Sequence, residues 1–440
     1  MASKWSRATL STLVSSLEAG VSVNSNDRPP NTGELGVLKT SAISGGTFNP
    51  NESKTVLPAE RSRVCTCVTA NCIIVSRMNT PELVGESALV DDDFPNLFLP
   101  DRLWLMMVQD ERCQARWLSH FLRSSISRRF IAVSATGTSG SMKNLPKPRF
   151  LAMPVDVPPL PEQRAIAAVL DTIDDAIQKT EQIIAKLQQV KQGLLHDLLT
   201  RGIDDNGELR DPERHPEQFQ DSPLGRIPKG WEVVRLRDEI RIEHGFAFPG
   251  TGFVDEPRGP VLLTPGNFHR DGGLYFERSN TKHFIGSVPV GYVLRAGDIV
   301  TVMTDLSPRT LILGRTEVVG TERTLLHNQR IGKVVPLRVG RWTNNLLAMA
   351  MSQPPIRGRV VREATGTTVR HTSPDRILAC CIARPGMAEQ EVILQVMAAE
   401  MVREAIELET HRRLVALRAG LSEDLLTGRV RTTSLPGFSA

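Results

Sequence analysis

The sequence predicts an α+β protein with a pseudo-two-fold internal repeat, in which two globular domains are separated by a pair of long antiparallel coiled-coil helices. Three observations predict this fold class. The chain of 440 residues repeats itself at an offset of 227 residues. Each copy ends in about 40 residues with a heptad pattern of apolar side chains, which is typical of a coiled-coil helix. Elsewhere, short apolar runs bounded by Gly, Pro and Asn alternate with helical patterns, as in α+β domains.

The repeat is clearest in the two segments with the heptad pattern. Residues 162–201 match residues 389–428 at 11 of 40 positions without a gap. Upstream, the sequence Ala-Thr-Gly-Thr at 135–138 recurs at 364–367. A period near 227 residues is far too long for a solenoid repeat, and it indicates one domain-plus-helix module that is used twice.

The repeat divides the chain into six segments. In chain order they are the first globular domain 1–158, the first spacer helix 159–202, a linker 203–230, the second globular domain 231–386, the second spacer helix 387–428 and a C-terminal tail 429–440. The linker is polar and rich in Asp, Glu and Pro, which is typical of an exposed linker. The elements expected inside the domains include strands at 72–77, 298–303 and 331–337 and helices at 117–130 and 342–351.

The first spacer helix carries an apolar seam at steps of four and three residues. Its predicted pairing residues are Ile166, Leu170, Ile173, Ile177, Ile184, Leu187, Leu194 and Leu198. Forty residues at about 1.5 Å each make a rod of about 60 Å. A long connector between two such helices favours an antiparallel pair. The alternative is two separate amphipathic helices that each pack on their own domain.

The second spacer helix has the same seam at its two ends. Its predicted pairing residues are Ile393, Met397, Leu414, Leu421 and Leu425. In the middle, Glu404 and His411 occupy seam positions, while Met401 and Leu408 lie about one position away. Either the phase of the helix shifts locally, as in a stutter, or the middle of the coil is open and solvated.

The net charge of +4 hides an uneven distribution. Residues 1–158 hold 17 basic and 14 acidic side chains, a net charge of +3, and residues 231–386 hold 21 and 14, a net charge of +7. The remaining segments hold 15 and 21, a net charge of −6. Arginine-rich domains suit contacts with phosphates and base edges, because a guanidinium group binds both bidentately. The sequence therefore indicates two basic domains on an acidic framework.

Several functions are excluded by motifs that the sequence lacks. No run of about 18 apolar residues could span a membrane, and no signal-peptide pattern occurs at the N-terminus, so a cytoplasmic protein is expected. No GxxxxGK[ST] loop, HExxH pair or Asn/Asp-Pro-Pro-Tyr/Phe tetrapeptide is present, so no catalytic site is expected. Cys65, Cys67 and Cys72 could supply three metal ligands, but structural zinc sites usually draw on two knuckles. Reduced, mostly buried thiols and no metal are expected.

The most distinctive motifs lie at the ends of the first helix and at the junction of the two copies. Residues 159–166 are Pro-Leu-Pro-Glu-Gln-Arg-Ala-Ile, and the helix ends in Leu-Leu-Thr at 198–200. Residues 219–231 are Phe-Gln-Asp-Ser-Pro-Leu-Gly-Arg-Ile-Pro-Lys-Gly-Trp. With these motifs, the repeat and the Gly-Thr turns, the chain resembles the specificity subunits of type I restriction-modification systems over essentially its full length.

The resemblance implies a non-catalytic DNA-recognition subunit of a phage-defence complex that methylates adenine in DNA. Two target-recognition domains would each read one half of a split sequence in double-stranded DNA. The helices would dock two modification (methyltransferase) subunits, and restriction/translocase subunits would join for cleavage. S-adenosylmethionine would be bound by the modification subunit, and this chain would hold no cofactor. The rigid helix pair would then set the length of the unread spacer between half-sites.

The resemblance and the repeat also suggest which side chains contact DNA. In the first domain they are Lys39, Thr40, Ser41, Arg77, Thr138, Ser139 and Lys143. In the second domain they are Thr264, Asn267, His269, Arg270, Thr304, Arg309, Gln329, Arg330, Thr368, Arg370 and His371. Asn or Gln can pair bidentately with adenine, and Arg with guanine. Any one of them could instead contact a phosphate or be a solvated loop residue.

Some alternatives stay open. The second helix begins after Pro-Gly at 385–386, without the Pro-Leu-Pro motif, and its middle is charged, so its docking of a modification subunit is in doubt. A self-sufficient methyltransferase-nuclease would need the missing active-site motifs. A coiled-coil scaffold that reads no DNA would explain the helices, but it would not explain the duplicated, arginine-rich domains.

Overall fold

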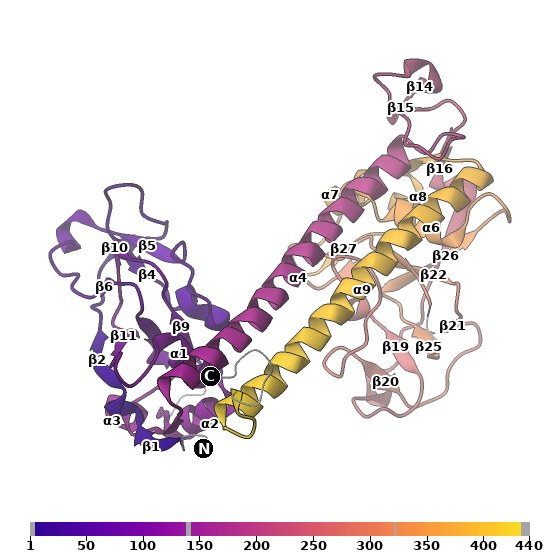
Figure 1. Ribbon diagram of the computed structural model, residues 1–440. Helices are drawn as coiled ribbons and strands as arrows, with labels where there is room; N and C mark the ends of the chain where they lie inside the picture. The colour runs from indigo at the N-terminus through magenta and orange to yellow at the C-terminus, as the bar shows by residue number, and fades with distance from the viewer. Residues whose placement is uncertain (1–4, 138–141, 321–322, 433–440) are drawn as a thin grey trace. The chain divides into compact units, whose positions relative to one another are not determined.

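The computed structural model describes residues 5–137, 142–320 and 323–432. The chain divides into two compact units: unit 1 is Met1–Ile183 with Glu407–Ala440, and unit 2 is Ile184–Ile406. Each unit contains one α+β domain and one half of each of two long helices (Figure 1). The predicted fold class, with its two domains and two long helices, is confirmed.

Two sheets form the domain of unit 1. One has the strand order β2-β11-β7-β9 and the other the order β3-β5-β4-β10-β6, in which only β4 and β10 run parallel. The first sheet consists of β2 (Val14–Ala19), β7 (Ile73–Ser76), β9 (Ser87–Leu89) and β11 (Leu103–Val108). The second consists of β3 (Ser25–Asn26), β4 (Gly36–Leu38), β5 (Ser53–Val56), β6 (Cys67–Val68) and β10 (Phe94–Phe98).

The central strands of the first sheet are buried on both faces. Ile73 and Val75 of β7 pack into a core with the helix residues Trp117 and Leu118, whereas Ile74 packs into a separate core with strands of the second sheet. Successive side chains of a strand point to opposite faces, so a strand between two cores is apolar at every position. This burial explains why the sequence at 72–77 is an unbroken apolar run.

Unit 2 repeats this topology strand for strand. Its sheets have the orders β17-β26-β22-β24 and β18-β20-β19-β25-β21, again with one parallel pair, β19 and β25. The strands of the first sheet are β17 (Ile240–His244), β22 (Ile299–Val302), β24 (Thr316–Val318) and β26 (Ile331–Pro336). Those of the second are β18 (Phe253–Val254), β19 (Val261–Leu263), β20 (Lys282–Phe284), β21 (Val293–Leu294) and β25 (Leu325–His327). The predicted internal repeat is therefore a repeat of the whole domain fold.

A further strand pair closes each domain next to its long helix. These pairs are β1 (Ser6–Thr9) with β13 (Pro154–Val157), and β16 (Glu232–Arg235) with β28 (Cys381–Arg384). The short helices are α1 (Ala115–Arg123), α2 (Ser125–Ser134) and α3 (Lys147–Leu151) in unit 1, and α5 (Leu236–Glu239), α6 (Asn344–Met351), α7 (Pro354–Arg362) and α8 (Pro374–Leu378) in unit 2.

The single helix predicted at 117–130 is wrong, because the chain breaks it at Ser124. Ser124 has extended backbone angles, with ψ at 158°. Its Oγ accepts a hydrogen bond from the amide of Ser127 at 3.4 Å and so caps α2. A serine in this position satisfies an N–H group that has no partner in the first turn of a helix.

The long helices are α4 (Leu160–Thr200) and α9 (Met387–Leu426), and a buried glutamine anchors the start of each. The side-chain amide of Gln163 donates to the carbonyls of Pro158 and Arg112 at 2.9 and 3.0 Å. That of Gln390 donates to the carbonyls of Pro385 and Arg341 at 3.0 and 2.9 Å. The second helix is thus anchored like the first, although it lacks the Pro-Leu-Pro motif.

A Trp–Glu–Arg clasp holds the start of each long helix to the segment that follows the other helix. In unit 1, Glu162 accepts hydrogen bonds from Trp5 at 3.0 Å and from Arg431 at 2.6 Å. In unit 2, Glu389 accepts them from Trp231 at 2.9 Å and from Arg210 at 2.5 Å. The tail after α9 therefore serves unit 1 as the segment after α4 serves unit 2.

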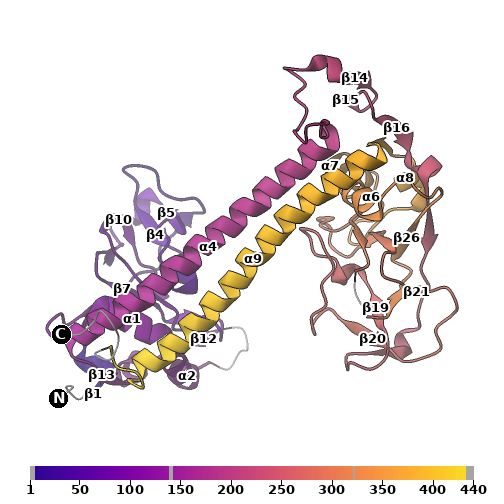
Figure 2. The same cartoon turned by 45° about the vertical axis from the view of Figure 1, so that its right-hand side comes forward.

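The halves of α4 and α9 lie side by side and antiparallel within each unit (Figures 1 and 2). In unit 1, Asp174 bonds Arg418 at 2.9 Å, and Glu181 bonds His411 at 3.0 Å. In unit 2, Gln188 bonds Glu404 at 3.1 Å. Positions in α4 rise in steps of seven while those in α9 fall in steps of seven, so the phase does not shift in the middle of α9.

The middle of the seam is polar instead. Glu404 is half-buried and forms an ion pair with Lys191, while Met401 and Leu408 are 51% and 37% exposed. The apolar side chains that lie one position from the seam therefore face away from α4. In α4, the predicted pairing residues are all buried or half-buried.

The segment predicted to be an exposed linker is partly wrong, since it holds a β-hairpin. The hairpin consists of β14 (Phe219–Ser222) and β15 (Gly225–Pro228). Phe219 and Ile227 are buried, and Ile227 joins the core of unit 2. Within the described residues, no helix combines the length and the apolarity needed to cross a membrane.

Candidate nucleic-acid interface

Each unit has a short ladder of two strands beside its Gly-Thr turn. The ladder strands are β8 (Met78–Asn79) with β12 (Lys143–Asn144) in unit 1, and β23 (Thr304–Asp305) with β27 (Arg370–His371) in unit 2. The registers correspond, because Lys143 lies opposite Asn79 and Arg370 lies opposite Asp305. The repeat therefore places one basic side chain, Lys143 or Arg370, at the same ladder position of each domain.

These two basic side chains make the same contact. Nζ of Lys143 donates to the carbonyl of Gly137 at 2.8 Å, and Nη1 of Arg370 donates to the carbonyl of Gly366 at 2.8 Å. The two glycines have φ of 145° and 91°, values that residues with a side chain rarely adopt. Because Lys has three N–H donors and Arg has five, each cation keeps donors for a further partner.

Four of the predicted DNA-contacting residues of unit 2 gather at its ladder. Oγ1 of Thr304 lies 3.1 Å from Nδ1 of His371. Next to it along the chain, the amide of Met303 donates to the carbonyl of Arg330 at 3.0 Å. Thr304, Arg330, Arg370 and His371 thus come from three separate chain segments into one region. Of these, Arg330 and His371 are exposed.

The remaining predicted residues of unit 2 fall into two groups. Those that lie exposed on loops are His269, Arg270, Arg309, Gln329 and Thr368. Asn267 is fully buried: its Oδ1 accepts the amide of Thr264 at 2.8 Å, and its Nδ2 donates to the carbonyl of Asn280 at 3.1 Å. These bonds cap a short turn, so the structure gives Asn267 an internal role in place of the predicted pairing with adenine.

In unit 1, Arg77 joins Lys143 at the ladder. Arg77 lies between β7 and β8, and its carbonyl accepts the amide of Leu145, just after β12, at 2.8 Å. Its guanidinium carbon lies 5.8 Å from the centre of the Trp104 ring, a cation–π distance. Thr138 and Ser139, which were expected in the same region, lie outside the described residues.

The other candidates of unit 1 lie at the start of the 3₁₀ segment η2 (Thr40–Gly46). Nζ of Lys39 lies 3.4 Å from Oδ1 of Asp27, and Oγ of Ser41 donates to Oε2 of Glu52 at 2.6 Å. Coulombic attraction to Lys39 and Lys54 lowers the pKa of the Asp27 carboxyl. No printed contact links this group to the ladder, so the predicted residues of unit 1 form two groups.

The prediction missed two ladder residues of unit 1. Met78 and Asn79 occupy the positions of Thr304 and Asp305, and Asn144 occupies that of His371. Asn144 has a buried Oδ1 without a hydrogen-bond partner in the structure. Applying the repeat offset backwards from Thr304 and His371 would have found these residues.

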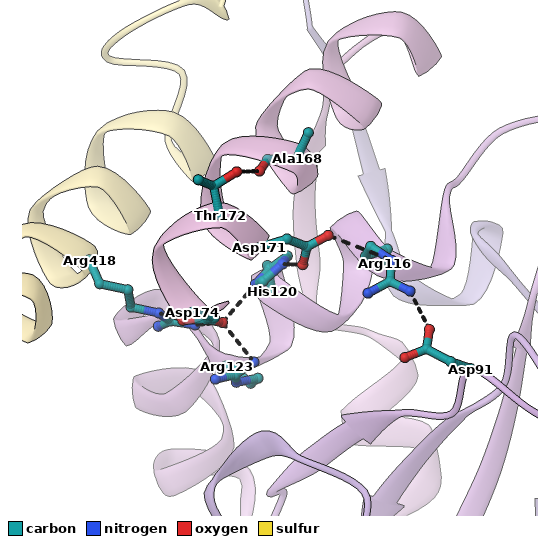
Figure 3. A network of polar contacts seen from close by, with 9 residues as sticks. All are labelled: Asp91, Arg116, His120, Arg123, Ala168, Asp171, Thr172, Asp174 and Arg418. Carbon is teal, nitrogen blue, oxygen red and sulfur yellow. Dashed lines mark hydrogen bonds and ion pairs between the residues drawn. The ribbon is translucent and has the colours of Figure 1, made fainter. Parts of the chain in front are cut away.

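A cleft of about 770 Å³ lies in unit 1 between the domain and α4. The acidic residues that line it are Asp91, Asp92, Asp171, Asp174, Asp175 and Glu181. Figure 3 shows how basic side chains bridge several of these carboxylates. Nε2 of the buried His120 lies 2.8 Å from Oδ1 of Asp171, and Arg418 of α9 bonds Asp174. Because such a lining repels phosphates, we place the nucleic-acid interface elsewhere in the unit.

No metal site accompanies the ladders. Among residues 5–137, 142–320 and 323–432, no three His, Cys, Asp or Glu side chains are grouped so that they could hold a metal ion. Cys65, Cys67 and Cys72 are free thiols, and burial raises the pKa of Cys72 to about 11.

The chain was compared with known proteins. Residues 44–189 match the family model of the type I restriction modification DNA specificity domain. The MjaVIII specificity subunit of Methanocaldococcus jannaschii is 21% identical over 320 residues, which span 72% of this chain and 70% of that protein. The EcoEI specificity subunit of Escherichia coli is 26% identical over 199 residues, 44% of this chain and 33% of that protein.

A solved structure agrees in fold. The S subunit of a type I restriction-modification system from M. genitalium aligns with a TM-score of 0.54 and 13% identity, over 96% of both chains. The domain match, the curated relatives and the shared two-domain fold point the same way. The chain belongs to the family of specificity subunits of type I restriction-modification systems.

Proposed function

We propose that this chain is the DNA-recognition subunit of a type I complex and that it reads a bipartite target, one domain to each half-site. The observation that carries the proposal is the doubled ladder, with Lys143 in one domain and Arg370 at the same position of the other. Both residues can donate to base edges or phosphates. Two copies of one fold with different side chains at the same position are what a reader of two different half-sites needs.

The distribution of charge supports the proposal. The domains carry net charges of +3 and +7, while the helices, the linker and the tail together carry −6. A basic surface is drawn to the phosphate backbone, and an acidic one is repelled by it. DNA would therefore lie along the domains and stay off the long helices.

The long helices would bind the modification subunits. Met401, Leu408 and Val415 are exposed on α9 and stand seven residues apart, so they share one face of the helix. Exposed apolar stripes on helices commonly mark protein interfaces. The modification subunits would bind S-adenosylmethionine and transfer the methyl group, restriction/translocase subunits would cut, and the assembly would work in the cytoplasm.

One experiment tests the central claim. The chain is expressed with its modification subunits, and methylated adenines are mapped by sequencing across the host genome. We expect two short motifs at a fixed separation, with a methylated adenine in each. A genome without such methylation, or a single continuous motif, would contradict bipartite reading by this chain.

The second candidate function is a non-catalytic coiled-coil scaffold that does not read DNA sequence. The exposed apolar stripe of α9 favours it as well, because a scaffold needs the same surface. A gel-shift assay with and without the modification subunits separates the two. A scaffold would retard specific and scrambled duplexes equally, whereas a DNA reader would prefer duplexes that contain its motif.

A further inference from the structure

The two domains hold one loop in the same way. The loop follows β8 in unit 1 and β23 in unit 2, and an arginine from the second short helix of each domain fixes it. Arg128 of α2 donates to the carbonyl of Val84 at 2.8 Å and to that of Glu82. Arg357 of α7 donates to the carbonyl of Leu313 at 3.0 Å and to that of Leu311.

The end of each loop is fixed to the core at matching residues. Val84 and Leu313 are buried, and each is followed by a glycine with φ near 75°, Gly85 or Gly314. A Cβ on Gly85 would lie 2.6 Å from Ile131. Every member of this set is separated from its counterpart by 229 residues, so the scaffold around the loop is conserved between the copies.

The loops differ in length between these fixed ends. Upstream of the loop, Met78 and Thr304 match at an offset of 226, whereas downstream the offset is 229. Unit 1 has two residues, 80–81, where unit 2 has five, 306–310. The change in the repeat offset is therefore an insertion of three residues at one place, next to the ladder.

The longer loop is held in a defined shape. The carboxylate of Asp305 is 2% exposed and accepts the amides of Ser307 at 2.7 Å, Ile312 at 2.8 Å and Leu313 at 3.2 Å. Arg357 also donates to the carbonyl of Thr310 at 3.1 Å. Thr310 has φ of 51°, a conformation that a β-branched residue adopts only when its surroundings impose it.

This shape displays a basic side chain between two apolar ones. Arg309 is exposed, and Leu306 and Leu311 on either side of it are 56% and 44% exposed. Arginine pairs bidentately with the O6 and N7 atoms of guanine, and apolar side chains contact the methyl group of thymine. Both contacts are made in the major groove.

We propose that residues 306–311 are the principal base-reading element of unit 2, with Arg309 as its specificity-determining residue and Asp305 and Arg357 as positioning residues. The proposal rests on the proposed function, because it concerns how one half-site is read. The shorter loop of unit 1, held by Arg128, reads the other half-site with different side chains. The insertion gives the two domains different specificities without any change in the fold.

The test uses the full-length chain with its modification subunits and a randomised library of duplex DNA. The motif bound by the wild type is compared with that bound by Arg309→Ala. We expect the variant to lose discrimination by roughly 10- to 100-fold at one or two base pairs of one half-site, and to keep the other half-site. Arg338→Ala, at another exposed arginine of unit 2, is the matched control and should leave both half-sites unchanged.

The positioning residues are tested by a reciprocal pair. Lysine keeps the charge but cannot donate to two carbonyls in the fork geometry of arginine. Arg357→Lys should weaken discrimination at the half-site that Arg309→Ala affects, and Arg128→Lys should weaken it at the other half-site. A purely structural role would lower the melting temperature without moving base preference in either half-site.

The outcomes separate the two proposals. If the wild type selects a two-part motif and Arg309→Ala selects the same motif with uniformly lower affinity, the residue contacts phosphate and the inference falls while the proposed function stands. The same holds if Arg309→Ala weakens binding of a protein subunit and leaves the motif intact. If the wild type selects no motif, both the inference and the proposed function are overturned.

Discussion

Arg431 donates hydrogen bonds from Nε and Nη2 to the two carboxylate oxygens of Glu162, a residue 269 positions earlier in the chain, each at 2.6 Å. Glu162 is almost fully buried, and it also accepts a hydrogen bond from Trp5. The contact joins the tail after α9 to the first turn of α4 within unit 1.

Replacing Arg431 should therefore loosen unit 1. Arg431→Ala leaves a buried carboxylate without its charged partner, and we expect the free energy of unfolding to fall by about 2 kcal/mol. The measurement is denaturant unfolding followed by tryptophan fluorescence, since Trp5 lies in the same clasp. Arg429→Ala removes an exposed ion pair to Asp424 and should change stability by less than about 1 kcal/mol. Equal losses for the two variants would contradict the role of the clasp.

Acid should weaken the same contact. Burial alone would raise the pKa of Glu162, but the hydrogen bonds from Arg431 and Trp5 and the charge of Arg431 outweigh it and hold the pKa below its ordinary value of 4.5. A carboxyl whose pKa is lower in the folded state stabilises the fold above its unfolded pKa, and this contribution is lost as pH falls through the folded pKa. The pKa of Asp174 is lowered too, because its bonds to Arg418 outweigh burial.

We therefore expect the melting temperature to be level above about pH 5 and to drop below about pH 4.5. Glu162→Gln should lower the melting temperature at neutral pH and make the acid drop shallower. Glu391→Gln, at an exposed residue of α9, should leave the profile unchanged. A Glu162→Gln profile parallel to that of the wild type at every pH would count against the linkage.

The helix seam should tolerate charge outside it and not within it. Leu187 lies on the seam of α4 and is half-buried, whereas Val190 is 43% exposed. Leu187→Asp should cost about 2–3 kcal/mol, because it buries a carboxylate without a partner and removes apolar contact. Val190→Asp should cost less than about 1 kcal/mol. Helix content by circular dichroism during thermal unfolding measures both, and a similar loss for the two would contradict the observed seam.

The two loop glycines should differ in their sensitivity to alanine. Both have positive φ, but a Cβ on Gly85 would lie 2.6 Å from the Ile131 side chain, whereas one on Gly314 would lie 3.2 Å from Val360. We expect Gly85→Ala to destabilise by about 2–3 kcal/mol and Gly314→Ala by about 1 kcal/mol, since only the first also forces a core side chain to move. Calorimetry of the full chain checks the order, and the reverse order would contradict it.

Matched deletions in the helices test the spacer proposal. The pairs Glu181 with His411 and Gln188 with Glu404 fix the register, so removing residues 178–184 together with 408–414 keeps the seam aligned. Seven residues shorten a helix by about 10 Å. Methylation mapping should then show a shorter spacer with both half-site sequences unchanged. Altered half-sites with an unchanged spacer would contradict the proposal.

Much of the fold could be predicted because the repeat and the periodicity carry it. The offset near 227 residues predicted two copies of one domain, and the two copies have the same strand orders. The seam from Ile166 to Leu198 predicted the face of α4 that is least exposed. These features depend on many residues at once, so single exceptions do not hide them.

The remainder depends on single polar contacts that a pattern does not contain. Neither alternative offered for the middle of α9 anticipated its ion pair, in which Lys191 meets Glu404 with the phase unchanged. Asn267 has the side chain of an adenine reader, but it caps a turn, and only the positions of Thr264 and Asn280 reveal this. Ser124 breaks the predicted helix because its hydroxyl competes for a backbone N–H group.

The division of the chain into units has a consequence for its synthesis. Unit 2 is one continuous stretch, Ile184–Ile406, whereas unit 1 needs both Met1–Ile183 and Glu407–Ala440. As the ribosome proceeds from the N-terminus, all of unit 2 is made before the last strand of contacts for unit 1 exists. Glu162 waits for Arg431 throughout that time, so the domain that is translated first is the one that is completed last.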